Sequence, residues 1–296
     1  MDHSNSSFSI ASAYSDFKEI TKVRLSVSVV FSSIAGYLLG CDTIDGFVLI
    51  LLALGGYFMV GASNAYNQII ERDLDALMDR TKRRPIPDGR MSVNTAFVIA
   101  VSFTILGIAC LYVINPRTAM YGAISIFLYT SVYTPLKTKT PLSVFVGAIP
   151  GAIPFMLGWV AARNEFGIEP GTLFAIQFLW QFPHFWAIGW FLYDDYEKGG
   201  FFMLPTKKRD KGTAVQIIMY TIWTVLASII PAFGVTGDLH LSVVGAIIVL
   251  ALGLVMLYYA FRLYKLRTSK AAKQLMLSSV TYITLLQIVY VVDKYI

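Results

Sequence analysis

The sequence has little charge and few of the residues that build metal clusters or disulfide frameworks. Of its 296 residues only 14% are charged, 3 are histidine and 2 are cysteine, Cys41 and Cys110. The two cysteines lie far apart and form no C-x-x-C motif, so we expect neither a disulfide framework nor a cysteine-ligated metal site. A soluble domain of this length needs more polar surface than this chain can supply. The composition therefore excludes an ordinary soluble protein.

Apolar residues take the place of charge, since 56% of the chain is hydrophobic and its mean hydropathy is +0.63. A helix of about 20 apolar residues crosses a bilayer core of about 30 Å. The sequence predicts an all-α polytopic membrane protein, with a polar tail over 1–22 and one transmembrane domain over 23–296. The first apolar run is expected to remain in the mature protein, because no signal-peptide pattern precedes it. The nine predicted spans are 23–40, 47–70, 94–114, 118–135, 142–162, 171–193, 213–234, 239–261 and 273–292.

The basic residues predict the orientation of these spans. If the N-terminus is cytoplasmic, 21 of the 24 Lys and Arg residues fall on the cytoplasmic side, and only Arg117, Arg163 and Lys294 lie outside. This asymmetry is what the positive-inside rule predicts. Topology and anionic membrane lipids also account for the net charge of +6, so no nucleic-acid partner is expected.

One polar segment, "NQIIERDLDALMDRTKRRPIP" at 67–87, interrupts the apolar sequence. Asn67, Glu71, Asp75 and Asp79 recur at every fourth residue, and each such step advances about 40° around a helix. The first three share one helix face, whereas Asp79 requires the helix to end or bend. Oxygen ligands at this spacing suit Mg²⁺, and the Arg and Lys residues that follow suit a diphosphate.

A second acidic loop follows the sixth predicted span and contains Asp194 and Asp195, with basic residues after them. Either loop alone could be a solvated helix end stabilised by surface salt bridges. Two acidic loops on the same predicted membrane face favour the interpretation as a binding site.

Three segments together resemble the UbiA intramembrane prenyltransferases. The segment 67–87 is similar to their Asn-x-x-x-Asp-x-x-x-Asp signature, with Glu71 in place of the middle Asp. The version here, with "YTPLKTKTPLS" (133–143) and "QFPHFWAIGWFLYDDYEKGGFFMLP" (181–205), looks like the protoheme IX farnesyltransferase branch of that superfamily. Thr138 and Ser143 depart from the pattern of that branch, where Arg and Asn are usual, and the second loop has no Asp-x-x-x-Asp because Lys198 follows Asp194 by four residues.

The resemblance implies a UbiA-type helical bundle that transfers a farnesyl group from farnesyl diphosphate to the 2-vinyl group of protoheme IX, with Mg²⁺ assisting ionisation to an allylic carbocation. The product is heme O. The implied metal ligands are Asn67, Glu71, Asp75, Asp79, Asp194 and Asp195. The implied diphosphate-binding residues are Arg72, Arg80, Lys82, Arg84 and Lys137, and Tyr133 is expected beside the carbocation.

His184 is a candidate for contact with heme. It lies about nine residues, or roughly 13 Å, below the predicted cytoplasmic end of its helix. An ionisable residue at that depth is expected to face the interior of the bundle. It could instead be a structural histidine that is hydrogen-bonded between helices, and ligation of the heme iron stays open.

Other functions remain open at this point. A related prenyltransferase acting on a quinone precursor or a chlorophyll-type acceptor would share the first acidic segment. A secondary transporter would need polar residues at mid-membrane, whereas here the acidic residues gather at one face. The expected location is the cytoplasmic (inner) membrane of a bacterium, with the active site facing the cytoplasm and heme A synthase or a terminal oxidase as possible partners.

Overall fold

The computed structural model describes residues 10–296, in which helices joined by turns and loops are present and no β-strand is found. Within the predicted tail, residues Ile10–Ile20 form a helix, α1. The other elements are α2 (Val23–Gly40), α3 (Gly46–Ile70), α4 (Arg72–Asp75), α5 (Val93–Ile114), α6 (Pro116–Phe127), the π-helix η1 (Leu128–Tyr133), α7 (Thr134–Leu136), α8 (Ser143–Arg163), α9 (Ile168–Phe191), α10 (Tyr193–Lys198), α11 (Lys211–Ala227), the 3₁₀ helix η2 (Ile230–Phe233), α12 (Val243–Leu266) and α13 (Ser269–Tyr295).

Every predicted span coincides with a helical segment. Seven segments of the described chain are long and apolar enough to cross a bilayer: α2, α3, α5, α8, α11 with η2, α12 and α13. The other two are α9, which carries polar residues along its length, and the segment from α6 to α7, which is divided by η1. The chain is therefore a multi-pass membrane protein. The count of nine crossings and the cytoplasmic N-terminus stay predictions.

The π-helix η1 explains why one predicted span is not a regular helix. Such wide turns occur mostly as short bulges, often at functional sites. Here the Thr134 hydroxyl donates to the Tyr129 carbonyl at 2.8 Å, a bond that spans five residues. The helix restarts at Thr134 and ends at Leu136, next to Lys137. The bulge thus sets the positions of Tyr133, Thr134 and Lys137 at the end of this span.

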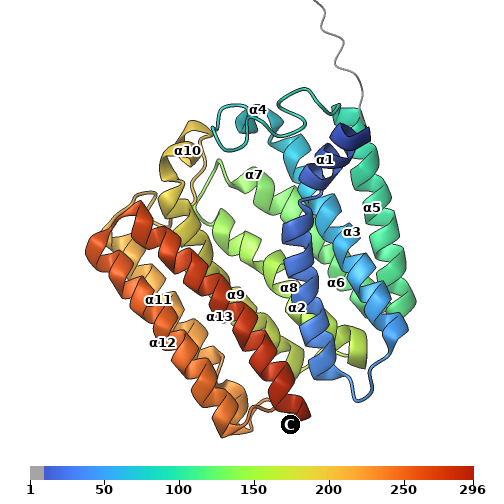
Figure 1. The fold of residues 1–296 in the computed structure, drawn as a ribbon, viewed down its shortest axis with the longest axis vertical. Helices are drawn as coiled ribbons and strands as arrows, with labels where there is room; N and C mark the ends of the chain where they lie inside the picture. Colours follow the sequence, from blue (N-terminus) through green and yellow to red (C-terminus); the bar gives the residue numbers. More distant parts are fainter. Residues whose placement is uncertain (1–9) are drawn as a thin grey trace, which may run out of the picture.

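The long helices run side by side in a bundle whose two halves meet at α8 and α9 (Figure 1). Helices α2 and α8 approach closely through glycines: a Cβ atom at Gly158 would collide with the Ser33 carbonyl oxygen, and one at Gly36 with the Phe155 carbonyl oxygen. Small residues at such crossings allow membrane helices to pack by close van der Waals contact. The α9 half has its own core, which includes the buried Trp186 and Trp190.

Helices α2 and α13 lie close at one end of the bundle and separate toward the other (Figure 1). At the near end the Lys294 ammonium donates to the Leu39 carbonyl at 2.8 Å, and Ser32 donates to Gln287 at 3.2 Å. The short helices α4, α7 and α10 all lie at the end where α2 and α13 are apart (Figure 1). Both acidic loops are therefore at the same end of the bundle.

Candidate active site

Three predicted site residues lie on successive helical turns where α3 ends and α4 begins. The helix ends at Ile70, Glu71 bends the chain, and α4 follows at once. Backbone hydrogen bonds nevertheless continue in four-residue steps, from Glu71 N–H to Asn67 O at 2.9 Å and from Asp75 N–H to Glu71 O at 2.7 Å. Asn67, Glu71 and Asp75 are all buried, and Asp79 lies beyond the end of α4 and is exposed. The predicted shared face and the predicted helix end before Asp79 are both confirmed.

Glu71 forms a buried ion pair with Lys137. The Lys137 ammonium lies 2.9 Å from Glu71 Oε1, and the two side chains are 10% and 5% exposed. The same ammonium lies over the rings of Tyr133 at 4.6 Å and Phe201 at 5.7 Å. Burial opposes the charge on Lys137, but the charge and hydrogen bond of Glu71, together with Tyr129 and Tyr196, outweigh it and raise the pKa of the ammonium. Lys137 is therefore held charged although its side chain is almost fully buried.

Asp75 pairs with Arg84 by a charge-assisted bond of 2.6 Å between Oδ2 and the guanidinium. Arg84 reaches it because the chain after α4 folds back, and the Thr81 hydroxyl helps by donating to the Asp75 carbonyl at 2.9 Å. The second carboxylate oxygen of Asp75, Oδ1, is buried and has no hydrogen-bond partner among the described residues. A buried anionic oxygen without a partner is costly unless a ligand completes it.

The two acidic loops are in direct contact. The Asp195 carboxylate accepts the backbone N–H groups of Asp79 at 2.7 Å and of Arg80 at 3.3 Å. Lys198 forms an ion pair with Asp79, which also pairs with Lys82 at 2.6 Å. Hydrogen bonds from Lys198 and then Lys82 lower the pKa of Asp79 to about 2. The second loop thus holds the first in place.

The remaining predicted residues lie at the rim. Asp194 is exposed and forms a two-bond pair with Arg209, at 2.5 and 3.2 Å. Arg72 lies outside, 3.5 Å from Asp73, and Arg80 lies over the Tyr196 ring at 5.8 Å. Among residues 10–296 no three Asp, Glu, His or Cys side chains gather as a metal-binding group. Of the six predicted metal ligands, the structure brings Asn67, Glu71 and Asp75 together in the buried site and leaves Asp79, Asp194 and Asp195 in the loop contacts.

Tyr133 and His184 occupy different parts of the bundle. Tyr133 is buried beside the site, against Gly147, where any Cβ would meet its ring at 2.6 Å. His184 is half-buried in α9, where Nδ1 lies 2.9 Å from the Ser279 hydroxyl of α13 and the ring stacks on Trp180. Asn67 is joined to the Tyr133 segment by a 3.2 Å bond from its amide to the Thr134 hydroxyl.

Comparison with known proteins identifies the architecture. The profile of the UbiA prenyltransferase family matches residues 29–285, and that range contains every predicted site residue. The chain belongs to the UbiA prenyltransferase family. Its relatives include the protoheme IX farnesyltransferase of Christiangramia forsetii, which is 74% identical over 97% of this chain and 95% of its own length.

Solved structures share the UbiA fold at low sequence identity. A structure described as digeranylgeranylglyceryl phosphate synthase in membranes superposes with a TM-score of 0.77 at 18% identity, over 95% of this chain and 98% of the other. A UbiA homolog from Archaeoglobus fulgidus bound to GPP and Mg²⁺ gives 0.68 at 16% identity, over 94% and 99% of the two chains. UbiA-family proteins of known structure thus include one that holds a prenyl diphosphate with Mg²⁺.

The buried residues of this UbiA-family chain fit a magnesium ion. Mg²⁺ prefers carboxylate oxygens and usually takes only one or two of them, keeping water and substrate phosphate oxygens in its other positions. Glu71 and Asp75 supply two buried carboxylates, and Asp75 Oδ1 is free to accept a ligand. Asn67 adds an amide one turn away on the same face. The donor set is therefore suited to a metal that shares its coordination with a diphosphate.

One residue of this UbiA-family site was not predicted from the sequence. Lys22 lies between α1 and α2 in a left-handed conformation, with φ of 46°, which is uncommon for a residue other than glycine. The preceding turn is anchored to α3, because the Gln68 amide donates to the Ile20 carbonyl at 3.0 Å. Burial, followed by the positive charges of Arg84, Lys137 and Arg80, lowers the pKa of Lys22 to about 7. The sequence analysis missed Lys22 because its place near the site depends on the left-handed turn between α1 and α2, and no sequence pattern marks that turn.

Proposed function

We propose that the chain transfers the farnesyl group of farnesyl diphosphate to the 2-vinyl group of protoheme IX, giving heme O and diphosphate. The observation that carries this proposal is the buried site at the end of α3, where two carboxylates and several cationic side chains converge. The acceptor is assigned from likeness to the relative at 74% identity, which is named protoheme IX farnesyltransferase.

The cationic residues bind the diphosphate. Lys137 and Arg84 are already positioned by Glu71 and Asp75. Lys22 lies close enough for the charges of Arg84 and Lys137 to lower its pKa. Arg80, Lys82 and Arg72 line the more exposed rim. Because these groups are fixed before ionisation, they stabilise the charge that develops on the leaving diphosphate more than they stabilise the bound substrate.

Glu71 and Asp75, assisted by Asn67, would hold Mg²⁺ against the diphosphate. A magnesium ion bound there supplies positive charge at the departing oxygen atoms. Asp195 takes part indirectly, because its carboxylate fixes the backbone of Asp79 and Arg80. Asp194 and Asp79 are the outermost of the predicted ligands, and their present ion pairs must open before they reach a metal.

The allylic cation needs neighbouring side chains that stabilise its charge but do not react with it. The buried Tyr133 ring lies directly under the Lys137 ammonium, so its face already accommodates a positive charge. The π electrons of the 2-vinyl group then form the new carbon–carbon bond with C1 of the farnesyl cation. The cation left next to the porphyrin ring takes up water and releases a proton, which gives the hydroxyethylfarnesyl group.

His184 is assigned to the heme side of the site, on the helix that leads to the second acidic loop. Its half-buried ring is surrounded by Trp180 and Phe185, with ring centroids at 4.7 and 5.4 Å. These aromatic neighbours make this side of the site apolar, as the hydrocarbon part of a porphyrin requires. We place the enzyme in the inner membrane of a bacterium with the active site toward the cytoplasm, and heme A synthase or the assembly of a terminal oxidase as the consumer of its product.

One experiment separates this function from the alternatives. The purified protein is incubated with heme, farnesyl diphosphate and Mg²⁺, and the porphyrin products are identified by mass. A farnesylated, hydrated heme supports the proposal. Prenylation of a quinone precursor or a chlorophyll-type acceptor, with heme unchanged, would assign a related prenyltransferase. Cation or solute uptake by vesicles without any prenyl transfer would instead assign a transporter.

A further inference from the structure

The His184 imidazole is held from two sides by residues that are not part of the diphosphate site. The Trp180 ring stacks on it, with centroids 4.7 Å apart and planes inclined by 18°. On the α13 side, Nδ1 lies 2.9 Å from Ser279 Oγ. Trp180 is itself fixed to α13, because its indole N–H donates to the Ser279 carbonyl at 2.7 Å. Both the plane and the rotation of the imidazole are therefore set by the contact between α9 and α13.

The hydrogen bonds of Ser279 determine which imidazole nitrogen carries the proton. A serine hydroxyl has one proton to donate. Ser279 Oγ lies 2.7 Å from the Met276 carbonyl, which can only accept, so the hydroxyl proton is used there. If that proton pointed at His184 instead, two lone pairs would face each other at 2.7 Å. Nδ1 must therefore be the donor to Ser279 Oγ, and Nε2 carries the free lone pair of a neutral imidazole.

Within residues 10–296 the one hydrogen bond of the His184 side chain uses Nδ1, and Nε2 has no partner. A lone pair cannot bind a heme propionate, because carboxylate oxygens are also acceptors. It can bind a Lewis acid, and histidine ligands of metals commonly donate their other N–H to an oxygen as His184 does here. The arrangement fits an imidazole prepared for a metal centre that arrives with the substrate.

We infer that His184 Nε2 is an axial ligand of the porphyrin iron and that Ser279 and Trp180 are positioning residues that set its tautomer and plane. This inference rests on the proposed function. The iron takes no part in forming the carbon–carbon bond, so its ligation serves to place the porphyrin. Coordination fixes the distance of the ring from α9, while the stacked Trp180 restricts its tilt.

Porphyrins with and without a metal test this directly. Binding of zinc protoporphyrin IX and of metal-free protoporphyrin IX is measured by fluorescence, without farnesyl diphosphate. The wild type should bind the zinc form more tightly by about tenfold or more. His184→Ala should remove this preference, and Ser279→Ala should reduce it. Ser279→Thr keeps the hydroxyl and should restore it.

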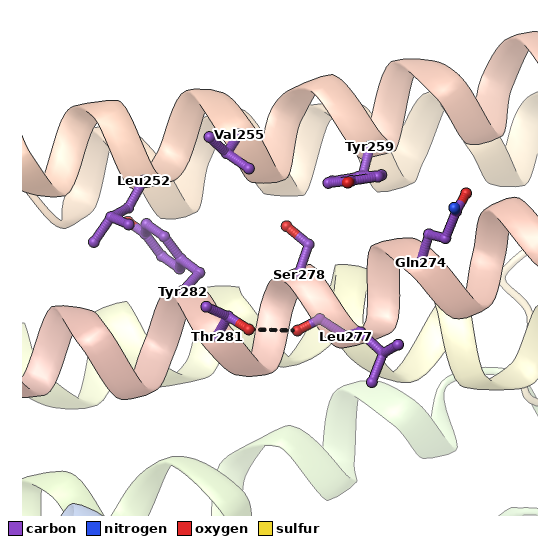
Figure 2. A pocket seen from close by; sticks show the side chains of 8 residues that line it. All are labelled: Leu252, Val255, Tyr259, Gln274, Leu277, Ser278, Thr281 and Tyr282. Atoms are coloured by element: carbon purple, nitrogen blue, oxygen red, sulfur yellow. Dashed lines mark hydrogen bonds between the residues drawn. The ribbon is translucent and has the colours of Figure 1, made fainter.

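Ser278 provides a matched control. It lies one residue from Ser279 but points toward α12, in a groove of about 300 Å³ that also contains Tyr259 and Gln274 (Figure 2). Ser278→Ala should leave the preference for the metal unchanged. Farnesyl diphosphate binding, measured for every variant, shows that the helical bundle is intact. Equal loss in Ser278→Ala and Ser279→Ala would overturn the positioning role.

The spectrum of bound ferric heme provides a second measurement. His184→Ala should lose the absorption signature of histidine ligation, and free imidazole in the medium should restore it. If the wild type farnesylates heme but binds both porphyrins equally, the ligation is refuted and the proposed function stands. If no porphyrin is farnesylated under any condition, the proposed function itself fails.

Discussion

The two acidic loops both place basic residues after acidic ones, but their environments differ. In the first, Glu71 and Asp75 are buried and each is paired with a cation that faces the site. In the second, Asp194 is exposed and turned toward Arg209, and Asp195 binds the backbone of the first loop. The difference supports our proposal that the first loop binds the metal and the diphosphate and that the second holds it in position. Carboxylate content alone does not distinguish the two loops, whereas burial and an unpartnered oxygen do.

The largest predicted difference between the loops is in turnover. Asp75→Asn keeps the shape of the side chain but removes the charge from the unpartnered oxygen, so heme farnesylation should fall by about 100-fold or more. Removal of Mg²⁺ with EDTA should have an effect of the same size on the wild type and little further effect on the variant. Asp194→Asn is the matched control and should stay within a few-fold of wild type. Equal losses in both variants would contradict the division of roles.

The buried ion pair of the first loop should also matter for stability. Lys137→Met leaves the Glu71 carboxylate buried without its cation, which should lower the free energy of unfolding by about 3 to 5 kcal/mol. Combining it with Glu71→Met removes the unpaired charge and should restore most of that stability. Turnover should stay low in the double variant, because both the metal side and the diphosphate side have lost a group. Thermal unfolding in detergent, measured beside the farnesylation rate, separates the two effects.

The contact between the loops should have a smaller effect. Asp195→Ala removes the acceptor for two backbone N–H groups, and each unmet bond is worth about 1 kcal/mol. Hydrogen exchange at residues 76–84 should become faster, and KM for farnesyl diphosphate should rise by about tenfold with kcat less affected. Asp194→Ala should change neither. Unchanged exchange in Asp195→Ala would show that the second loop does not support the first.

Much of the fold and the inner site could be predicted from the sequence, because their determinants are local. The apolar runs gave 23–40 as the observed bounds of α2, and 47–70 differs from α3 by one residue. The four-residue spacing placed Asn67, Glu71 and Asp75 on one face, since backbone geometry determines that face. Membrane insertion and helix periodicity each depend on a short stretch of chain. The helix bounds and the shared face could therefore be predicted from the sequence.

The roles that depend on contacts between distant segments could not be predicted. Asp194 and Asp195 are neighbours in sequence, yet they point about 100° apart around α10, and only Asp195 reaches the first loop. The tautomer of His184 depends on Ser279, 95 residues away. The π-helix η1, which positions Lys137, leaves no periodic signal in the sequence.

The smallest predicted effect concerns Lys22. This residue belongs to neither acidic loop, but its charge acts on the cationic residues around the first loop. Its pKa of about 7 means that the ammonium is charged below pH 7 and loses its proton as the pH rises above that value. A bound diphosphate favours the charged form, so the affinity for farnesyl diphosphate should fall as pH rises from 6.5 to 8.0, by about eightfold at most. Lys22→Met should bind more weakly at pH 6.5 and show a flatter profile.

The ratio of wild-type to variant affinity at each pH isolates Lys22, because the phosphate groups of the substrate titrate equally in both proteins. Lys18 is exposed on α1 and lies over the Tyr14 ring, so Lys18→Met should follow the wild-type profile. If Lys22→Met and Lys18→Met give the same curve, Lys22 has no part in binding the diphosphate. A ratio that approaches one at high pH, where the Lys22 side chain is neutral in the free protein, would instead place its charge among the groups that hold the substrate.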